Sequence, residues 1–484
     1  MSDGNDNGGA PNAKRLLWAG FMAILAAGVG FSIRAGILAD WGSQFGFTQT
    51  DLGNITGGGL TGFGIIILLG ALIADKVGYG RLLIFAFSMH LASAILTLAA
   101  TPLYKMGGKD AAYQCLYWGM FLFAVGNGTA EAVVNPLVAA LFTKNKTHYL
   151  NILHAGWPAG LVLGGLASYF MVGKVRWEIQ MSLFMIPVVF YGLMCIGQRF
   201  PRSEASKHGV SFGEMLAEFA APVLLLLLVI HALLGYVELG TDSWISNITG
   251  NIMASRDKGL LLFVYTSSLM FALRFFAGPI VEKISPLGLL FVGAACGATG
   301  LTLLSGAETV AFVVVAASIY GVGKTFLWPT MLAVVSERFP KGGAITIGAM
   351  GGIGMLSAGL LGGPGIGYNQ DYFASNDLKT KAPAVYDQYK SSTKNHFLAF
   401  PEIQGLDGTK VGAVRNKDAS ARTPEETQVH DADLHGGRMA LKMTAAIPAT
   451  MAVLYLVLIL YFKAKGGYKA VHIIGVGKEA EEVA

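Results

Sequence analysis

Twelve apolar stretches, most of about 20 residues or more, alternate with shorter polar segments along the chain. An α-helix needs roughly 20 apolar residues to cross the hydrocarbon core of a bilayer. Barrel strands would instead alternate over about ten residues, and runs such as 224–230 and 311–319 do not alternate. The pattern therefore predicts an all-α polytopic membrane protein with twelve transmembrane helices. We place these helices at 16–40, 52–74, 81–100, 112–139, 150–172, 179–199, 220–246, 259–282, 287–305, 308–335, 342–368 and 440–463.

A polar, basic stretch between the sixth and seventh helices divides the chain into two groups of six. The groups repeat each other, because an acid and a base follow the second helix at Asp75-Lys76 and the eighth at Glu282-Lys283. Parallel repeats of this kind hold a site between two pseudo-symmetric halves, near the bilayer midplane. The predicted organisation is an N-terminal tail 1–15, a six-helix half 16–199, a linker 200–219, a second half 220–463 and a C-terminal tail 464–484.

Composition and charge agree with a membrane protein. The chain is 53% hydrophobic and 13% charged, against roughly 25% charged in soluble domains. Lys and Arg number 16 in the short segments on the side of the termini and six on the other side, which predicts that both termini are cytoplasmic. The net charge of +5 is scattered over loops, so it reflects orientation and not nucleic-acid binding. We expect a monomer in the bilayer of a bacterial inner (plasma) membrane.

One polar segment, 369–437, interrupts the second half between the eleventh and twelfth helices. A connection this long is usually a disordered insert or a small functional cap. Apolar anchors such as Tyr386 and Phe397 favour partial order. The insert is predicted to be non-cytoplasmic.

Several motifs carry a family resemblance that covers essentially all twelve helices. They are Glu131-Ala-Val-Val-Asn135-Pro136, Asn151-Ile-Leu-His154-Ala-Gly-Trp157-Pro-Ala-Gly160, Tyr236 with Thr241 and Trp244, Arg274 with Gly278, and Trp328-Pro329-Thr330. In order and spacing they resemble the major facilitator superfamily, and within it most closely the fucose and hexose:proton symporters (the L-fucose permease-like family). The resemblance implies a transporter with the fold of that superfamily.

The same resemblance assigns a proton-titrating role to Glu131. Two positions depart from the family pattern. His154 and Trp157 stand where the family has amide side chains, and Ala35, beside Arg34, stands where it has a proton-linked Asp. The substrate and the coupling route therefore do not transfer directly.

Three carboxylates are the candidates for proton coupling: Glu131, Glu238 and Asp242. A carboxylate in a low-dielectric cavity resists ionisation, so Glu131 could load and release a proton as its exposure changes. The alternative for Glu131 is a permanent ion pair with Arg34 or Lys324 that fixes helix packing. Glu238 and Asp242 are four residues apart on one helical face, so they repel unless one is protonated, paired or hydrogen-bonded. Asp242 could alternatively be solvated near the outer surface.

Sugars bind through planar amide and carboxylate groups with an aromatic face against the ring. His154 could donate to a sugar or relay a proton, although a lone helical His is often a structural hydrogen-bonding group. Arg34 and Lys324 lie inside predicted helices, where each could neutralise a carboxylate or bind an anionic substrate. The substrate-binding candidates are Arg34, Asn127, Asn135, Asn151, His154, Trp157, Trp244, Lys324 and Trp328.

The acid and base residues near the cytoplasmic helix ends are candidates for gating. We expect them to latch the inner ends of the halves, with Arg274 pairing with Glu282 or with the Asp75 motif. The gating candidates are Asp75, Arg81, Arg274, Glu282 and Lys283.

The leading functional prediction is a secondary active transporter that imports a small polyhydroxylated solute, a monosaccharide, by alternating access with proton coupling. Small-molecule substrate, protons and the lipid bilayer are its expected partners. An alternative is an organic-anion transporter for a sugar acid that uses Arg34 and Lys324. A third hypothesis is a non-transporting membrane sensor that binds its ligand through 369–437. The sequence shows no metal-ligand cluster, nucleophile elbow or phosphate loop, so we predict no enzyme, catalytic residue, cofactor or metal.

Overall fold

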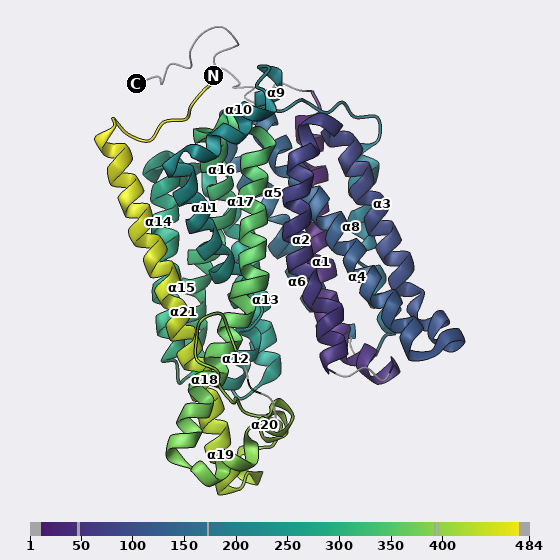
Figure 1. Cartoon of the computed structure of the whole chain (residues 1–484), viewed down its shortest axis with the longest axis vertical. Coiled ribbons are helices and arrows are strands. Elements are labelled where there is room, and N and C mark those ends of the chain that lie inside the picture. Colours follow the sequence, from purple (N-terminus) through teal and green to yellow (C-terminus); the bar gives the residue numbers. More distant parts are fainter. Residues whose placement is uncertain (1–10, 46–48, 172–173, 392–393, 395, 474–484) are drawn as a thin grey trace.

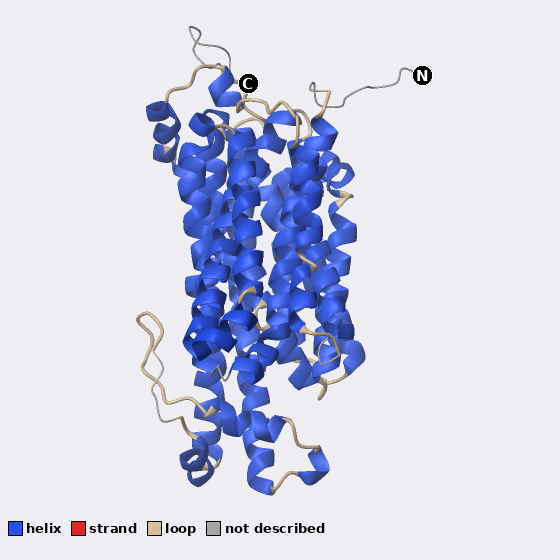
Figure 2. Ribbon diagram, turned by 90° about the vertical axis from the view of Figure 1, so that its right-hand side faces the viewer, coloured by secondary structure: helices blue, strands red, loops and turns tan. Residues whose placement is uncertain are grey.

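The computed structural model describes residues 11–45, 49–171, 174–391, 394 and 396–473. These residues form two groups of helices that lie side by side (Figure 1). No β-strand occurs among them, and the described chain is helices and connections (Figure 2). The predicted all-α class is confirmed.

The first group contains eight helical segments. Helix α1 packs against α6 and α8, and α4 packs against α2 and α3. The segments are α1 (Ala13–Phe45), α2 (Gln49–Val77), α3 (Tyr79–Leu98), α4 (Ala100–Leu141), α5 (Lys146–His154), α6 (Gly156–Met171), α7 (Trp177–Ser182) and α8 (Met185–Cys195).

A short helical linker joins the groups. It consists of α9 (Glu204–Lys207), α10 (Phe212–Ala217) and η1 (Glu218–Ala220). Ser211 begins α10 with a capping box, in which its hydroxyl accepts from the Glu214 amide and the Glu214 carboxylate accepts from the Ser211 amide. We call the end of the molecule that holds α9 and α10 the termini end (Figure 1).

The second group contains the remaining segments. They are α11 (Pro222–Gly235), η2 (Tyr236–Gly240), α12 (Ile245–Ile252), α13 (Arg256–Arg274), α14 (Ala277–Ser305), α15 (Val310–Thr325), α16 (Leu327–Arg338), η3 (Pro340–Gly342), α17 (Gly343–Ser357), η4 (Ala358–Gly362), α18 (Gly363–Lys381), α19 (Pro383–Tyr389), α20 (Gly408–Arg415), η5 (Ala419–Ala421) and α21 (Pro424–Ala464). Helix α14 packs against α15 and α21, and α18 packs against α21. The opposite end of the molecule, with α19 and α20, is the insert end (Figure 1).

Eleven helices among the described residues are long and apolar enough to cross a membrane. Helix α13 is outside that set because its 19 residues include Arg256, Asp257, Lys258 and Arg274. It nevertheless packs against α6 and α15 in the middle of the assembly. The count of twelve crossings therefore stays a prediction that rests on α13.

The predicted loop between the third and fourth crossings is instead helical. Ala99, which caps α3, keeps right-handed helical angles, and α4 begins at Ala100. The chain reverses at Gly108, whose φ of 69° is accessible to glycine without a steric penalty. The turn therefore depends on one glycine.

The 369–437 insert is ordered over the residues that the structure describes. The second half of α18, α19, α20 and the start of α21 enclose a small apolar core that includes Leu378, Val385, Val411 and Val429. Arg415 binds the Asp433 carboxylate through two hydrogen bonds of 2.5 and 2.6 Å. The segment is thus a helical cap on the second group.

Close glycine contacts set the distance between several helices. A Cβ at Gly352 of α17 would lie 2.5 Å from the Leu68 side chain of α2, and one at Gly64 would lie 3.0 Å from the Gly352 carbonyl oxygen. Small residues permit such an approach. We call this contact of α2 with α17 the glycine seam, and it joins the two groups.

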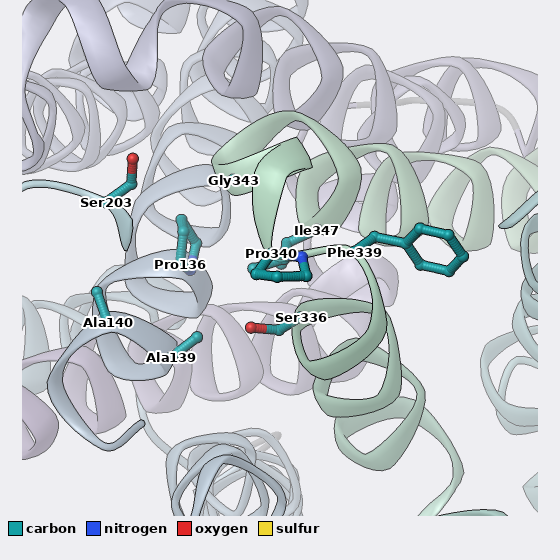
Figure 3. Close-up of a pocket in the computed structure, with 9 residues that line it drawn as sticks. All are labelled: Pro136, Ala139, Ala140, Ser203, Ser336, Phe339, Pro340, Gly343 and Ile347. Atoms are coloured by element: carbon teal, nitrogen blue, oxygen red, sulfur yellow. The ribbon is translucent and has the colours of Figure 1, made fainter. Parts of the chain in front are cut away.

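At the termini end the two groups are also linked by hydrogen bonds from α5 to α16. Lys146 Nζ donates to the Ser336 carbonyl at 3.2 Å and Thr147 Oγ1 to Glu337 Oε1 at 3.2 Å. Nearby, a cavity of only about 20 Å³ remains between Pro136 of α4 and residues of α16 and α17 (Figure 3). The groups are closed against each other at this end.

Replacing Gly235 with Ala should push α11 away from α17, because the new Cβ would lie 2.0 Å from the Gly354 carbonyl oxygen. We expect a loss of about 1–3 kcal/mol, the usual effect of overpacking. Thermal unfolding of purified protein in detergent measures the change. Gly213→Ala is the control, because nothing lies within 4 Å of its Cβ position; equal melting temperatures for the two variants would contradict the prediction.

Candidate functional site

A cavity of about 300 Å³ lies between the two groups of helices. The first group supplies most of its lining, including every charged and aromatic side chain, and the second group supplies small residues from η4 and its surroundings. Four of the 18 lining residues carry a guanidinium, amide or hydroxyl group, so the surface is mostly apolar. The lining residues are Ala27, Phe31, Arg34, Ala35, Leu38, Thr56, Gly59, Leu60, Phe63, Met120, Phe123, Ala124, Asn127, Trp157, Ser243, Ala358, Gly359 and Gly363.

Arg34 is the charged residue of this cavity, and it is 2% exposed. Its guanidinium donates to the Gly30 carbonyl and the Ser93 hydroxyl, both at 3.3 Å, and stacks on the Phe123 ring at 3.7 Å. It forms no ion pair with any described carboxylate. Desolvation costs several kcal/mol per ion, whereas a desolvated cation–π contact contributes about 2 kcal/mol. The described contacts of Arg34 therefore do not fully offset the free-energy cost of removing its guanidinium from water.

Asn127 is fixed beside Arg34 by a buried hydrogen-bond chain. Asn127 Oδ1 lies 2.9 Å from His90 Nε2, and His90 Nδ1 lies 2.9 Å from the Tyr191 hydroxyl. With the tyrosine hydroxyl donating to Nδ1, His90 donates through Nε2, which assigns the tautomer. The Asn127 amide nitrogen donates to no described residue, so it is available to the cavity.

A second, smaller cavity of about 20 Å³ lies next to the first, and Trp157 borders both. Glu131 and Glu238, one from each group, also line the smaller cavity. Such a volume holds about one water molecule. Two of the three predicted coupling carboxylates therefore meet at the interface between the groups.

Glu131 begins a hydrogen-bond chain toward the second group. Asn135 Nδ2 donates to Glu131 Oε2 at 2.6 Å, and Asn135 Oδ1 lies 2.8 Å from His154 Nε2. Arg274 donates to the His154 carbonyl and, at 3.2 Å, to Glu238 Oε1. The expected alternative, a salt bridge of Glu131 with Arg34 or Lys324, is not what the structure shows.

Two buried ion pairs hold the second group's carboxylates. Arg274 pairs with Glu238, and its Nε also donates to the Thr325 carbonyl at 2.8 Å. Lys324 pairs with Asp242. Each acid thus has its own base, which removes the repulsion expected between Glu238 and Asp242. The pairing expected for Arg274, with Glu282 or the Asp75 motif, is corrected to Glu238 because Arg274 faces the interface between the groups.

Glu238 lies in η2, a single π-helical turn. A second π turn, η4, packs against it, and a Cβ at Gly240 would lie 2.7 Å from the Cα of Gly362. Such turns insert one residue, redirect side chains and often occur at functional sites. Glu238 Oε2 and Trp328 Nε1 are buried and have no described hydrogen-bond partner. At the smaller cavity the first can therefore still accept a hydrogen bond and the second can still donate one.

Two sequence-predicted binding residues, Asn151 and Trp244, do not line either cavity. Asn151 donates to Thr330 Oγ1 at 3.2 Å and so joins α5 to α16 near the termini end. Trp244 donates its indole N–H to the Gly363 carbonyl at 2.8 Å. We therefore propose that Asn151 joins the two groups, that Trp244 fixes the start of α18, and that neither residue contacts the solute.

Apart from Arg274, which lines the smaller cavity, the predicted gating residues lie at the termini end. Asp75 and Arg81 line a pocket of about 240 Å³ with Arg202, and Glu282 lines another with Lys144. Among the described residues, Asp75, Arg81, Glu282 and Lys283 form no ion pair with one another. Their latching role stays a prediction, and the observed closure comes from α5 and α16.

Sequence reasoning missed Ser93, His90 and Phe123. Ser93 donates to the Gly119 carbonyl at 2.7 Å while accepting from Arg34, and the ring of Phe123 contacts both the Arg34 guanidinium and the His90 ring. A polar residue inside an apolar helix was the available signal for Ser93 and His90. Over the described part of the chain, no group of three or more His, Cys, Asp or Glu side chains could hold a metal ion.

Comparison with known proteins gives a family match and a shared fold. A sequence model of the Major Facilitator Superfamily matches residues 20–363. The E. coli fucose:proton symporter FucP, solved in an outward conformation, aligns with a TM-score of 0.62 and 15% identity over 91% of this chain and 98% of that chain. The proton:xylose symporter XylE, bound to 6-bromo-6-deoxy-D-glucose, aligns with a TM-score of 0.65 and 14% identity over 93% and 95%.

A curated relative is similar over a shorter length. The cis,cis-muconate transport protein of Acinetobacter baylyi is 24% identical over 177 residues, which are 36% of this chain and 40% of the relative. The chain thus spans less than half of that relative.

Arg274→Met should destabilise the protein strongly, because it leaves Glu238 buried without its base. We expect a loss of about 3–5 kcal/mol, measured by thermal unfolding in detergent. Adding Glu238→Gln should recover part of the loss, since the variants act on one ion pair. Arg176→Gln, which removes an exposed arginine, should leave the melting temperature unchanged. Strictly additive effects of the two substitutions would contradict the pairing.

Proposed function

The chain belongs to the Major Facilitator Superfamily and is an integral membrane transporter, and from that premise we propose that it moves a small organic anion by proton-coupled alternating access. The single observation that carries this choice is Arg34, a buried guanidinium in the lining of the cavity without a carboxylate partner among the described residues. A bound anion would supply the missing charge.

The observed closure supports the alternating-access part of the proposal. The groups touch through α5 and α16 at the termini end, while the larger cavity lies between Leu38, Thr56 and Ser243, toward the other end of the molecule. With both termini on the cytoplasmic side, as we propose, the closed end faces the cytoplasm and the larger cavity lies on the outer side of these contacts. Import then requires the α5–α16 hydrogen bonds to break.

Proton coupling is assigned to Glu131 and Glu238. Glu131 has no basic partner within hydrogen-bonding distance among the described residues, and it accepts from Asn135. A buried carboxylate without a base is stable when protonated, and it can release its proton when the interface opens to water. Because Arg274 bridges His154 and Glu238, a change at Glu131 is transmitted to the contact between the groups.

A monosaccharide is the second candidate solute. FucP and XylE, whose folds this chain shares, are described as fucose:proton and proton:xylose symporters. The amide of Asn127 and the indole of Trp157 in the cavity suit a sugar ring. The Arg34 guanidinium in the cavity lining favours the anion, and so does the similarity to a protein named as a cis,cis-muconate transport protein.

Glu131→Gln should abolish proton-driven accumulation while exchange of solute across the membrane continues, because glutamine keeps the hydrogen bond with Asn135 but cannot bind or release a proton. Uptake of labelled D-glucuronate, benzoate and L-fucose into proteoliposomes, with and without an imposed pH gradient, measures this. We expect at least a tenfold fall in accumulation, and Glu308→Gln, an exposed acid, should match the wild type.

Full accumulation by Glu131→Gln would remove Glu131 from the coupling role. Wild-type uptake that is the same with and without the pH gradient would contradict proton coupling altogether. In the same assay, competition separates the candidate solutes: stronger inhibition by the sugar than by either anion would favour the monosaccharide.

The cap should be dispensable for transport, because none of its residues lines either cavity. Since α18 packs against α21, residues 383–421 can be replaced by a short Gly-Ser linker. We expect uptake within about twofold of the wild type in proteoliposomes, because the replaced residues pack in the apolar core of the cap and not against the cavities. Loss of ligand binding in detergent on this replacement would instead support a sensor that uses the insert.

A further inference from the structure

We propose that the larger cavity binds a planar, apolar monocarboxylate, of which benzoate is the simplest example. The inference rests on the proposed anion transport and narrows its substrate to one charge and an aromatic or conjugated body. It follows from three properties of the cavity: its charge, its donors and its lining.

The charge of the site matches a single carboxylate. Arg34 contributes one positive charge to the cavity wall. The two other bases near the interface are neutralised within the protein, because Arg274 pairs with Glu238 and Lys324 with Asp242. The second negative charge of a dianion would find no cationic partner, because Arg274 and Lys324 are already paired. A neutral solute would leave the positive charge of Arg34 without an anionic partner.

The donors of the site are arranged for two carboxylate oxygens. Arg34 has five N–H groups, of which the structure engages two, with Gly30 and Ser93. Asn127 is held by His90 through its oxygen, so its amide nitrogen is left to donate. The ring of Phe123 lies against both the guanidinium and the His90 ring. His90 is thus a positioning residue for Asn127.

The remaining lining is apolar and rich in rings. Phe31 and Trp157 lie with their ring centroids 5.7 Å apart at 44°, and Phe63 lines the same cavity. The hydroxyls of Thr56 and Ser243 donate to carbonyl groups of their own chain segment at 2.9 and 3.0 Å. A hexuronate would place several hydroxyls against carbon surfaces, where they would go unpaired.

The volume fits such a molecule. A cavity of about 150 Å³ lined by apolar side chains holds benzene, and this one is about 300 Å³. Benzoate, or cinnamate with its longer conjugated arm, would therefore fit with its carboxylate at Arg34.

The test is ligand-induced thermal stabilisation and calorimetric binding with the full-length protein in detergent. Benzoate and cinnamate should bind at least roughly tenfold more tightly than D-glucuronate, muconate or L-fucose. Benzamide, a neutral molecule of the same shape, should bind at least tenfold more weakly than benzoate, because it lacks the charge.

Two variants test the site itself. Arg34→Gln should weaken benzoate binding by roughly 30-fold or more, the usual effect of removing one partner of a buried charged contact. It should also raise the melting temperature without ligand, because an unpaired buried cation is removed. Asn127→Asp should abolish benzoate binding by placing a carboxylate in the same site. Arg176→Gln is the matched control and should bind benzoate as the wild type does.

The outcomes separate this inference from the function it rests on. Unchanged benzoate affinity in Arg34→Gln overturns the inference. Binding of D-glucuronate in preference to benzoate overturns it too, but leaves anion transport standing. Binding of L-fucose without binding of any of the tested anions overturns both the inference and the proposed anion transport. If Arg34→Gln fails to fold, Asn127→Asp and the comparison of benzoate with benzamide still decide.

Discussion

An ion removed from water must be compensated by a partner, and this requirement organises the interior of the molecule. The second group of helices satisfies it internally, through Arg274 with Glu238 and Lys324 with Asp242. The first group does not, since Arg34 rests on Phe123 and Glu131 accepts only amide hydrogen bonds. The interface therefore holds one cation and one acid that have no charged partner among the described residues, and we propose that a solute anion and a proton bind to them.

The polar chain at the interface also explains why binding and conformation are linked. Arg274 belongs to the second group, yet it donates to the His154 carbonyl of the first. His154 in turn contacts Asn135, the residue that donates to Glu131. The same α5 continues toward the termini end with Asn151 and Thr147, whose hydrogen bonds reach α16. One short helix therefore carries both the coupling contacts and the closure contacts.

The sequence predicted the class of the fold and the family resemblance well, because a bilayer imposes long apolar helices. It also placed Glu131, Glu238 and His154 among the candidates, because ionisable side chains at membrane depth are costly and therefore conspicuous, and all three line the smaller cavity. It could not predict pairings. Arg274 and Lys324 were each within reach of several acids, and the choice depends on how η2 turns Glu238, a π-helical detail with no signature in the apolar pattern. His90 and Phe123 were missed because their roles exist only through neighbours on other helices.

The glycine seam has a mechanical meaning. Side chains that interdigitate across a helix contact must change rotamers before the helices can slide, so they raise the energy barrier to sliding. At Gly64 and Gly352 the backbones of α2 and α17 approach closely, and the side chains of Leu68 and Leu356 fill the space beside the two glycines. Neither glycine has a side chain that must change rotamer when α2 moves along α17, so we expect the glycine seam to resist relative motion of the two groups less than a contact of interlocking side chains would.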